Sequence, residues 1–413
     1  MSSKYLPHEL VLEILTWLLV KSLVRFRCVS KLWNSSITSR GFINAHLNKA
    51  NLLCNNNNKS HFLLLTEPDN TSPNLCMITC NNSSEVSRLE FPNSIPLSRF
   101  EFPNSFPPII VGVYNGIVCL RFTLEPTIYL WNFSIQQFKV LTTTCLSSYL
   151  KQTEISEMAV GFSYFSEIND YKIVRIVYFR SRNLEPWIEA EIYTLSTDSW
   201  RRLPTESLRS RKIHYVVISR RDTCQLVNGA LHWMSLVSVY GIRSNGIRAY
   251  IRTCLSSLCF DLNEERFREI VLPDIDFLEV GHKEFLVEYK GSLAVVTTSD
   301  AKICLWVMKV YGVVESWTKQ IVLPKIFDWF FSCSNTGVFI VEQDHRLILL
   351  DPETRRENNL GIQGVTWIVH VTNSMESLVL IGKWTCYSCP LICCLFLNPC
   401  HTSFIWSAIS SII

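Results

Sequence analysis

The chain has 413 residues, of which 48% are hydrophobic, 12% aromatic and only 18% charged. A chain this apolar can bury a large core, which excludes intrinsic disorder over most of its length. The formal net charge is +3, but residues 1–50 hold seven lysines and arginines against two glutamates, so they carry +5 and the rest of the chain −2. Nucleic acid is therefore not expected as the main partner, because its binding needs a strongly basic face.

The N-terminal segment is predicted to form a small all-α head of three helices. Apolar residues recur at helical spacing between positions 10 and 18, and Pro7 suits a first helical turn, where no amide donor is needed. A second short helix is predicted over residues 21–29, and Ser30 is placed to cap a third that runs to Ile37. Such short apolar helices are not stable alone, so they need one another and a partner surface.

The apolar run from Leu10 to Val20 has the length of a secretory signal core, but it contains Glu13 and no small-residue cleavage site follows it. A secreted protein is therefore not expected. The sixteen cysteines are predicted to be reduced thiols, most of them small core residues, in a cytoplasmic and/or nuclear protein.

Four regions follow from the change of pattern along the chain. Residues 4–47 are the helical head, and residues 48–60, with four consecutive asparagines, are predicted to be a linker. Residues 61–381 consist of short β-rich runs separated by turn residues. Residues 382–413 form a Cys-rich tail that has no charged residue after Lys383. A bilayer-spanning helix needs about 20 consecutive apolar residues, but prolines interrupt the apolar runs of this tail. No membrane association is therefore expected.

The β region contains a degenerate repeat in which an apolar strand, a polar turn and a strand that opens with an aromatic residue follow one another. A strand with a turn glycine precedes most of these hairpins, so that one unit has about four strands. This spacing fits the blades of a β-propeller of about six blades, with residues 62–91 as a less regular blade, better than a pair of non-repeating β-sandwiches. The hairpins are 128–141, 190–203, 257–270, 303–321 and 347–360, the anchoring aromatics are Phe138, Trp200, Phe267 and Trp317, and the turn glycines are Gly116, Gly229, Gly291 and Gly337.

No residues that would carry catalysis are found. The sequence has no phosphate-binding glycine loop, no nucleophile elbow and no zinc-protease motif. Asp274 and Asp276 are expected to be surface acids. Cys386 and Cys389 with their neighbours are expected to be buried thiols and not zinc ligands. His232 and the tryptophans of the hairpins are expected to lie in the blade cores, with their ring nitrogens bonded to backbone. The chain is therefore predicted to be no enzyme, with no metal and no cofactor.

Two stretches of sequence resemble a known family. Residues 6–15 (LPHELVLEIL) and 20–33 (VKSLVRFRCVSKLW) closely resemble the F-box of plant F-box proteins. The β region is similar to the F-box-associated interaction domain of the same plant family, which is often described as kelch-like. The motifs that carry this second resemblance are YNG at 114–116, LWN at 130–132, DYKIV at 170–174, NGALHW at 228–233, FDL at 260–262, YGV at 311–313 and ESWTK at 315–319.

The resemblance implies a substrate receptor of a Skp-cullin-F-box ubiquitin ligase. In that family the F-box docks on a Skp-type adaptor, which connects it to cullin and RING subunits. The β domain binds a target protein for ubiquitination and proteasomal degradation. By position, the resemblance implies adaptor-binding roles for Leu6, Pro7, Leu10, Ile14, Leu15, Leu18, Leu23, Cys28, Val29 and Trp33. Some head residues must form the head's own core, and Ile14 and Phe26 are expected to do so.

The sequence departs from the family at the turn between the first two helices. Leu19 stands where the family often has proline and Trp17 replaces a basic or polar residue, so this turn is expected to differ. Two other readings stay open: an S-locus F-box-type receptor that recognises a self-incompatibility ribonuclease, and a ligase-independent F-box binding module. No motif in the sequence identifies the target. Segments such as 180–189 and 238–252 are expected to determine which target is bound.

Overall fold

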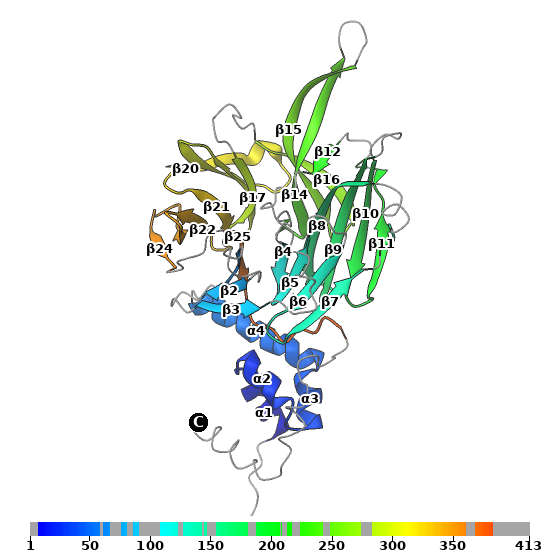
Figure 1. Cartoon of the computed structure of the whole chain (residues 1–413), viewed down its shortest axis with the longest axis vertical. Coiled ribbons are helices and arrows are strands. Elements are labelled where there is room, and N and C mark those ends of the chain that lie inside the picture. The colour runs from blue at the N-terminus through cyan, green and yellow to red at the C-terminus, as the bar shows by residue number, and fades with distance from the viewer. Residues whose placement is uncertain are drawn as a thin grey trace, which may run out of the picture.

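The computed structural model describes residues 7–57, 61–66, 76–80, 86–90, 108–122, 127–142, 144–146, 154–180, 187–206, 208, 213–216, 224–242, 248–273, 283–360 and 368–382 (Figure 1). A helical head comes first in the chain, and a ring of antiparallel sheets follows it. None of the helices in these ranges is long and apolar enough to span a membrane.

Between residues 7 and 57, which the structure describes without a gap, the head contains four helices: α1 (His8–Leu15), α2 (Val20–Phe26), α3 (Lys31–Ile37) and α4 (Arg40–Asn57). Ser30 caps α3 as predicted, because its hydroxyl accepts a hydrogen bond from the backbone N–H of Trp33 over 3.1 Å.

The fourth helix corrects the prediction of three helices and a linker over residues 48–60. Asparagine is a weak helix former, but α4 begins where Ser39 Oγ accepts a hydrogen bond from the N–H of Phe42, and it buries Phe42, Ile43 and Leu47 along one side. Packing of that apolar face stabilises the helix and extends it through the asparagines to Asn57.

The strands in the described ranges form six sheets. The first contains β1 (His61–Thr66), β2 (Cys76–Cys80), β3 (Val86–Glu90) and β25 (Ile368–Ser374); the second contains β4 (Ile109–Tyr114), β5 (Ile117–Arg121), β6 (Ile128–Asn132) and β7 (Gln137–Leu141); the third contains β8 (Glu154–Phe165), β9 (Asp170–Arg180), β10 (Trp187–Thr194) and β11 (Ser199–Leu203).

The fourth sheet contains β12 (Ile213–Val216), β13 (Gln225–Val227), β14 (Ala230–Ile242), β15 (Arg248–Asp261) and β16 (Arg266–Val271). The fifth contains β17 (Lys283–Tyr289), β18 (Ser292–Thr298), β19 (Lys302–Met308) and β20 (Trp317–Pro324), with the short helix η2 (Val314–Ser316) before β20; the sixth contains β21 (Trp329–Cys333), β22 (Phe339–Gln343), β23 (Arg346–Leu350) and β24 (Glu357–Asn359).

Each sheet contacts the next one, and the contacts close the six sheets into a ring. Strand β25 contacts β4, β4 contacts β8, β8 contacts β12 and β14, β13 and β14 contact β17, β17 contacts β21, and β21 contacts β25. Because β25 pairs with β1, the last described strand of the chain completes the first sheet. The predicted β-propeller-like domain after a helical head is confirmed, and each sheet is one blade.

The repeat found in the sequence is visible in the strand register. In four hairpins the anchoring aromatic lies directly opposite a large residue of the preceding strand: Trp131 pairs with Phe138, Tyr193 with Trp200, Phe260 with Phe267, and Met308 with Trp317. The turn before β5 has φ of 48° at Asn115 and 74° at Gly116, which is the type I′ geometry that Asn-Gly pairs favour. Local turn chemistry thus sets the register of the blades.

The head and the propeller share one apolar core. A single cluster of packed side chains contains Leu15, Leu23 and Phe42 of the head together with Val111 of β4 and Phe162 of β8. Figure 1 shows α4 between the other three helices and the propeller. The head is therefore packed against the second and third sheets and is not joined to them by a linker alone.

Candidate protein-docking surface of the helical head

The head exposes more large apolar side chains than a self-contained domain of its size needs. Of the fifteen exposed large apolar residues in the described part of the chain, seven lie between positions 10 and 52. They are Leu10 (47% exposed), Ile14 (42%), Trp17 (60%), Leu19 (72%), Val29 (40%), Leu32 (61%) and Leu52 (61%). Exposed apolar residues in this number mark an interaction surface. We name these seven residues the apolar head face.

The structure divides the ten adaptor-binding residues that the sequence predicts. Pro7, Leu10, Ile14, Cys28 and Val29 are exposed, Leu18 and Trp33 are half-buried, and Leu15 and Leu23 are buried in the core of the head. Leu6 lies outside the described residues.

The expectation that Ile14 belongs to the core is wrong, whereas Phe26 is half-buried and packs against it. Residues Leu10 and Ile14 are four positions apart and lie on the same side of α1, while Leu15 is turned by one residue toward the core. Leu15 is only 4% exposed, so it fills the core position that was expected for Ile14.

Three of the most exposed apolar residues were not among the predicted ones: Trp17, Leu19 and Leu32. A signal for Trp17 is its spacing, because positions 10, 14 and 17 recur at helical intervals. Leu19 adopts φ −61° and ψ 146° before α2, a geometry that proline also adopts. Leucine therefore adds an exposed apolar side chain to this turn without requiring a different backbone path.

Contacts among the helices hold the apolar head face in place. The rings of Phe26 and Trp33 pack edge to face with centroids 5.5 Å apart, and Arg27 Nε donates to Asn34 Oδ1 over 3.1 Å. The ring of His46 in α4 is hydrogen-bonded through Nε2 to the carbonyl oxygen of Leu18 over 3.0 Å. A surface held in this way loses little conformational entropy when a partner binds.

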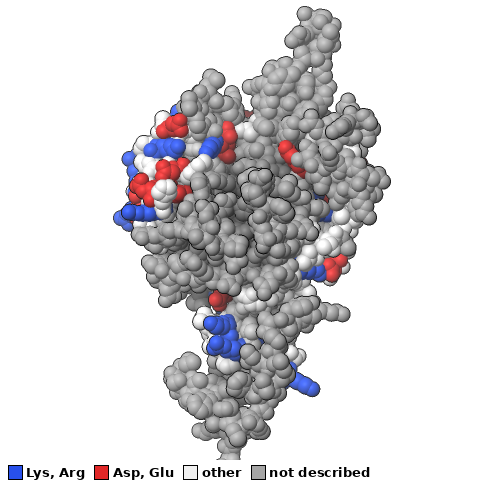
Figure 2. Space-filling view, viewed as in Figure 1, with Lys and Arg blue, Asp and Glu red and all other residues white. Residues whose placement is uncertain are grey.

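The exposed charges of the head are more often positive than negative, with Glu9 and Glu13 of α1 as the exposed acids. Lys21, Arg25 and Lys31 are exposed, and Lys49 Nζ lies 4.0 Å from the centre of the Trp17 ring. Figure 2 shows more blue than red side chains over the head, in contrast with the mixed charges on the propeller. Complementary charge steers association and fixes its orientation, so an acidic partner with an apolar groove fits this surface best.

The buried histidine of the propeller has a structural role. His232 is fully buried; its Nδ1 is 3.1 Å from Ser257 Oγ and its Nε2 is 3.1 Å from the Tyr311 hydroxyl. Burial lowers the pKa of His232 from 6.5 to about 4, so the ring is neutral at physiological pH. The prediction of a core position is confirmed, but these contacts are to side-chain hydroxyls. The indoles of Trp233 and Trp317 do donate to backbone, at Val160 and Val271 of the neighbouring sheets.

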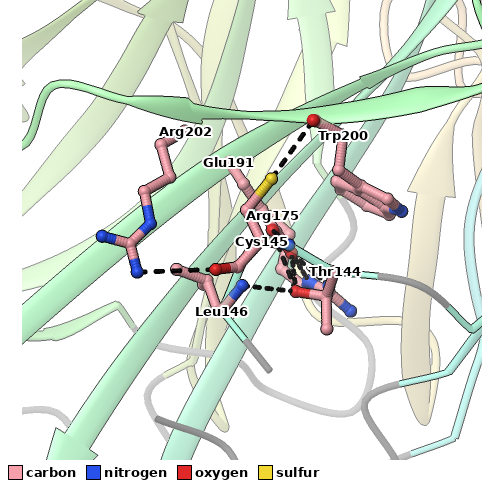
Figure 3. A network of polar contacts seen from close by, with 7 residues as sticks. All are labelled: Thr144, Cys145, Leu146, Arg175, Glu191, Trp200 and Arg202. Carbon is pink, nitrogen blue, oxygen red and sulfur yellow. Dashed lines mark hydrogen bonds and ion pairs between the residues drawn. The ribbon is translucent and has the colours of Figure 1, made fainter. Parts of the chain in front are cut away.

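A buried ion pair fixes the connection between the second and third sheets (Figure 3). Arg175 and Glu191 lie opposite each other on β9 and β10, and both are almost fully buried. Glu191 also accepts hydrogen bonds from the Thr144 hydroxyl over 2.8 Å and from the Cys145 backbone N–H over 2.9 Å, while the Arg175 guanidinium lies 4.5 Å from the Trp200 ring. Each of these polar groups is used to hold the 144–146 segment against the third sheet.

The described residues contain no cluster of three or more His, Cys, Asp or Glu side chains that could hold a metal ion. Asp274, Asp276 and the cysteines at 386 and 389 lie outside the described residues. Within the described ranges, the apolar head face is therefore the candidate functional site.

Comparison with known proteins agrees with this division of the chain. Residues 5–44 match a family model described as the F-box domain, and residues 70–398 match one described as the F-box associated beta propeller domain. The chain is 28% identical over 331 residues to the F-box/kelch-repeat protein At3g23880 of Arabidopsis thaliana, which covers 78% of this chain and 81% of that protein. It is 30% identical over 345 residues to F-box protein At3g07870 (76% and 72% covered) and 23% identical over 398 residues to F-box protein CPR1 (91% and 89% covered), both of the same plant.

The helical head, the ring of sheets that follows it and the two matched domains lead to one conclusion: the chain belongs to the family of F-box proteins with an F-box associated β-propeller domain.

Proposed function

We propose that this protein is the substrate-recognition subunit of a Skp-cullin-F-box ubiquitin ligase. Its F-box docks on a Skp-type adaptor through the apolar head face, and its propeller binds the protein to be ubiquitinated. The observation that carries the proposal is the apolar head face itself, because seven large apolar side chains are presented on a rigid and basic helical head. Adaptor-binding roles are proposed for the predicted residues that are accessible there: Pro7, Leu10, Leu18, Ile14, Cys28, Val29 and Trp33.

The mechanism is one of proximity. A target held on the propeller has a high local concentration near a ubiquitin-conjugating enzyme that the cullin and RING subunits recruit. No catalytic group of this chain takes part in that scheme. The core that the head shares with the second and third sheets supports it, because a fixed head and propeller give the target a defined distance from the adaptor.

The test is binding of the intact chain to a recombinant plant Skp-type adaptor, measured by calorimetry. The wild-type chain should bind, and Leu32→Asp should weaken binding by about a hundredfold, because it buries a charge in an apolar contact. Val322→Asp is the matched control, since Val322 is a 53% exposed valine on β20, which Figure 1 shows at the end of the propeller away from the head. Absence of binding by the wild-type chain, or equal binding by Leu32→Asp, would contradict the proposal.

A second experiment distinguishes a ligase subunit from a binding module that acts outside the ligase. The complex of the chain with its adaptor is mixed with recombinant cullin and RING subunits and analysed by size-exclusion chromatography. A ligase subunit co-elutes with cullin. A complex that forms with the adaptor but never with cullin would show that the chain works outside the ligase.

A further inference from the structure

Arg121 is a buried arginine of the propeller that has no anion beside it. It is the last residue of β5 and is only 4% exposed. Its neighbours across the sheet are Ile109 of β4 and Ile128 of β6, which are apolar and buried. The hydrogen bonds and ion pairs of the described residues include none to its guanidinium. A buried charge without a counter-charge is costly, so either the fold carries this cost or an anion from outside the chain compensates it.

The side chain of Arg121 lies at the end of an apolar interface. Side chains alternate along a strand, so Arg121 is on the same face of the second sheet as Ile117 and Cys119. These two residues belong to the apolar cluster that also contains Phe162 of β8 and Val177 of β9 in the third sheet. Packing between the second and third sheets therefore gives the guanidinium apolar surroundings and no carboxylate.

Other buried charges of the propeller do have partners. Arg175, in the same interface, donates from Nε to Glu191 over 2.7 Å. Lys172 is also buried, and its Nζ lies 3.4 Å from Glu265 Oε1. The fold thus compensates the cations that hold neighbouring elements together, and Arg121 differs from them.

The guanidinium of Arg121 is charged and accessible. Burial lowers its pKa from 12.5 to about 10, so it still carries a proton at neutral pH. None of its nitrogens is among the fully enclosed, unpaired side-chain atoms of the described residues, so each of them reaches solvent through a narrow opening. A cation in such apolar surroundings attracts a small anion more strongly than a cation on an open surface does.

The opening lies at the end of the second sheet away from the head. Asn115, in the turn between β4 and β5, donates through Nδ2 to the Tyr171 hydroxyl over 3.0 Å, beside the turn between β8 and β9. That second turn contacts the head, because Arg40 of α4 donates to the carbonyl oxygen of Asn169. Strand β5 runs from this end to the opposite one, where Arg121 lies. A ligand bound there does not meet an adaptor bound to the head.

We infer that Arg121 is the binding residue for an oxyanion, a carboxylate or a phosphate group, that enters at the face of the propeller away from the head. The planar guanidinium matches either group through two parallel hydrogen bonds. Its apolar surroundings reject a ligand without negative charge, because such a ligand leaves the cation uncompensated. The inference does not depend on the ligase, so it and the proposed function can fail separately.

The test measures urea unfolding of the full chain with sodium acetate or inorganic phosphate added, at an ionic strength held constant with chloride. An anion that binds the folded chain should raise the urea midpoint in a saturable manner. Arg121→Met should abolish this rise. Arg121→Lys keeps the charge without the planar fork, so it should weaken the apparent affinity by about tenfold. The anion that saturates at the lower concentration shows whether the site prefers carboxylate or phosphate.

Arg266→Met is the matched control, because Arg266 is an exposed arginine of β16. Its midpoint should rise with the anions as in the wild-type chain. Without added anion, Arg121→Met should have a higher urea midpoint than the wild-type chain, since it removes an uncompensated charge. Arg175→Met should have a lower one, because it leaves Glu191 buried without its cation.

Three results would overturn the inference. The first is the absence of a saturable rise with either anion. The second is an equal rise in the wild-type chain and in Arg121→Met, which would show that the anions act only by exclusion from the protein surface. The third is an Arg121→Met midpoint as low as that of Arg175→Met, which would show that a group of the chain itself compensates the guanidinium.

Discussion

The guanidinium of Arg40, at the first residue of α4, donates a hydrogen bond to the carbonyl oxygen of Asn169, 2.8 Å away in the turn between β8 and β9. These residues are 129 positions apart in the chain, so the bond joins the helical head to the third sheet of the propeller. The shared apolar cluster joins the same two parts in the interior, so α4 packs as part of both the head and the propeller. These contacts, on the surface and in the interior, keep the helical head and the propeller in a fixed relation.

The shared core predicts that head and propeller unfold together. Phe42→Ala removes a buried side chain of α4 from that core and should lower the free energy of unfolding by about 3 to 5 kcal/mol. Leu32→Ala truncates an exposed side chain and should change it by less than about 0.5 kcal/mol. Calorimetric melting of both variants should give a single transition; two separate transitions, with only the first sensitive to Phe42→Ala, would contradict a common core.

The Arg175 and Glu191 pair predicts strong coupling between two substitutions. Arg175→Met leaves a carboxylate buried without its cation and should destabilise the chain by about 3 to 5 kcal/mol. The double variant Arg175→Met with Glu191→Leu removes both charges and should be more stable than Arg175→Met alone. Urea unfolding of the two single variants and the double variant forms the cycle. Additive losses in the double variant would show that the ion pair is not what holds this site.

The buried His232 predicts that stability falls in acid. Its folded pKa of about 4 lies below its ordinary value of 6.5, so the unfolded chain takes up a proton on this ring before the folded chain does. The stabilisation is fully present above pH 6.5 and is lost as the pH falls toward 4, by about 2 kcal/mol between pH 7 and pH 5. Urea unfolding at the two pH values measures this loss.

Two variants isolate the contribution of His232. His232→Asn should lose less stability than the wild-type chain on going from pH 7 to pH 5, whatever its stability at pH 7. His345→Asn is the control, because the His345 side chain is 91% exposed, and its loss should equal that of the wild-type chain. The same loss in all three chains would mean that His232 does not contribute to the pH dependence.

Two turn glycines with similar backbone geometry should respond differently to alanine. Gly116 has φ +74°, and a Cβ there would lie 2.5 Å from the Ser377 Cβ, in the segment that follows β25. Gly291 has φ +80° with no atom within 4 Å of an added Cβ. Gly291→Ala should cost about 1 kcal/mol through its backbone alone, and Gly116→Ala clearly more, because the closing segment must shift. Equal melting temperatures of the two variants would contradict this close approach.

The sequence predicts those features of the fold that depend on neighbouring residues. The Asn115-Gly116 turn, the Ser30 cap and the paired aromatics such as Tyr193 and Trp200 depend on residues close in the chain, so turn chemistry and alternation reveal them. The helical course of residues 48–57 does not follow from local preference, because packing of the preceding residues of α4 against the rest of the molecule stabilises it.

The candidate site is predictable only in part, because packing between distant parts of the chain decides which residues are exposed. Leu10 and Val29 are found by resemblance, but whether Ile14 or Leu15 faces outward depends on the exact rotation of α1. The Tyr311 hydroxyl lies against the ring of His232, 79 positions earlier in the chain, and this contact joins the loop between β19 and β20 to the fourth sheet. No spacing rule in a single sequence reveals a contact of that kind.

Ubiquitin transfer in a reconstituted ligase tests directly whether the protein is a ligase subunit. The chain is combined with recombinant Skp-type adaptor, cullin, RING subunit, conjugating enzyme and ubiquitin, and ubiquitin attached to lysines of the chain itself is followed over time. Transfer should require cullin, and Leu32→Asp should abolish it while Val322→Asp should not. Transfer to the Leu32→Asp chain at the wild-type rate, or none to the wild-type chain bound to its adaptor and cullin, would contradict the proposed function.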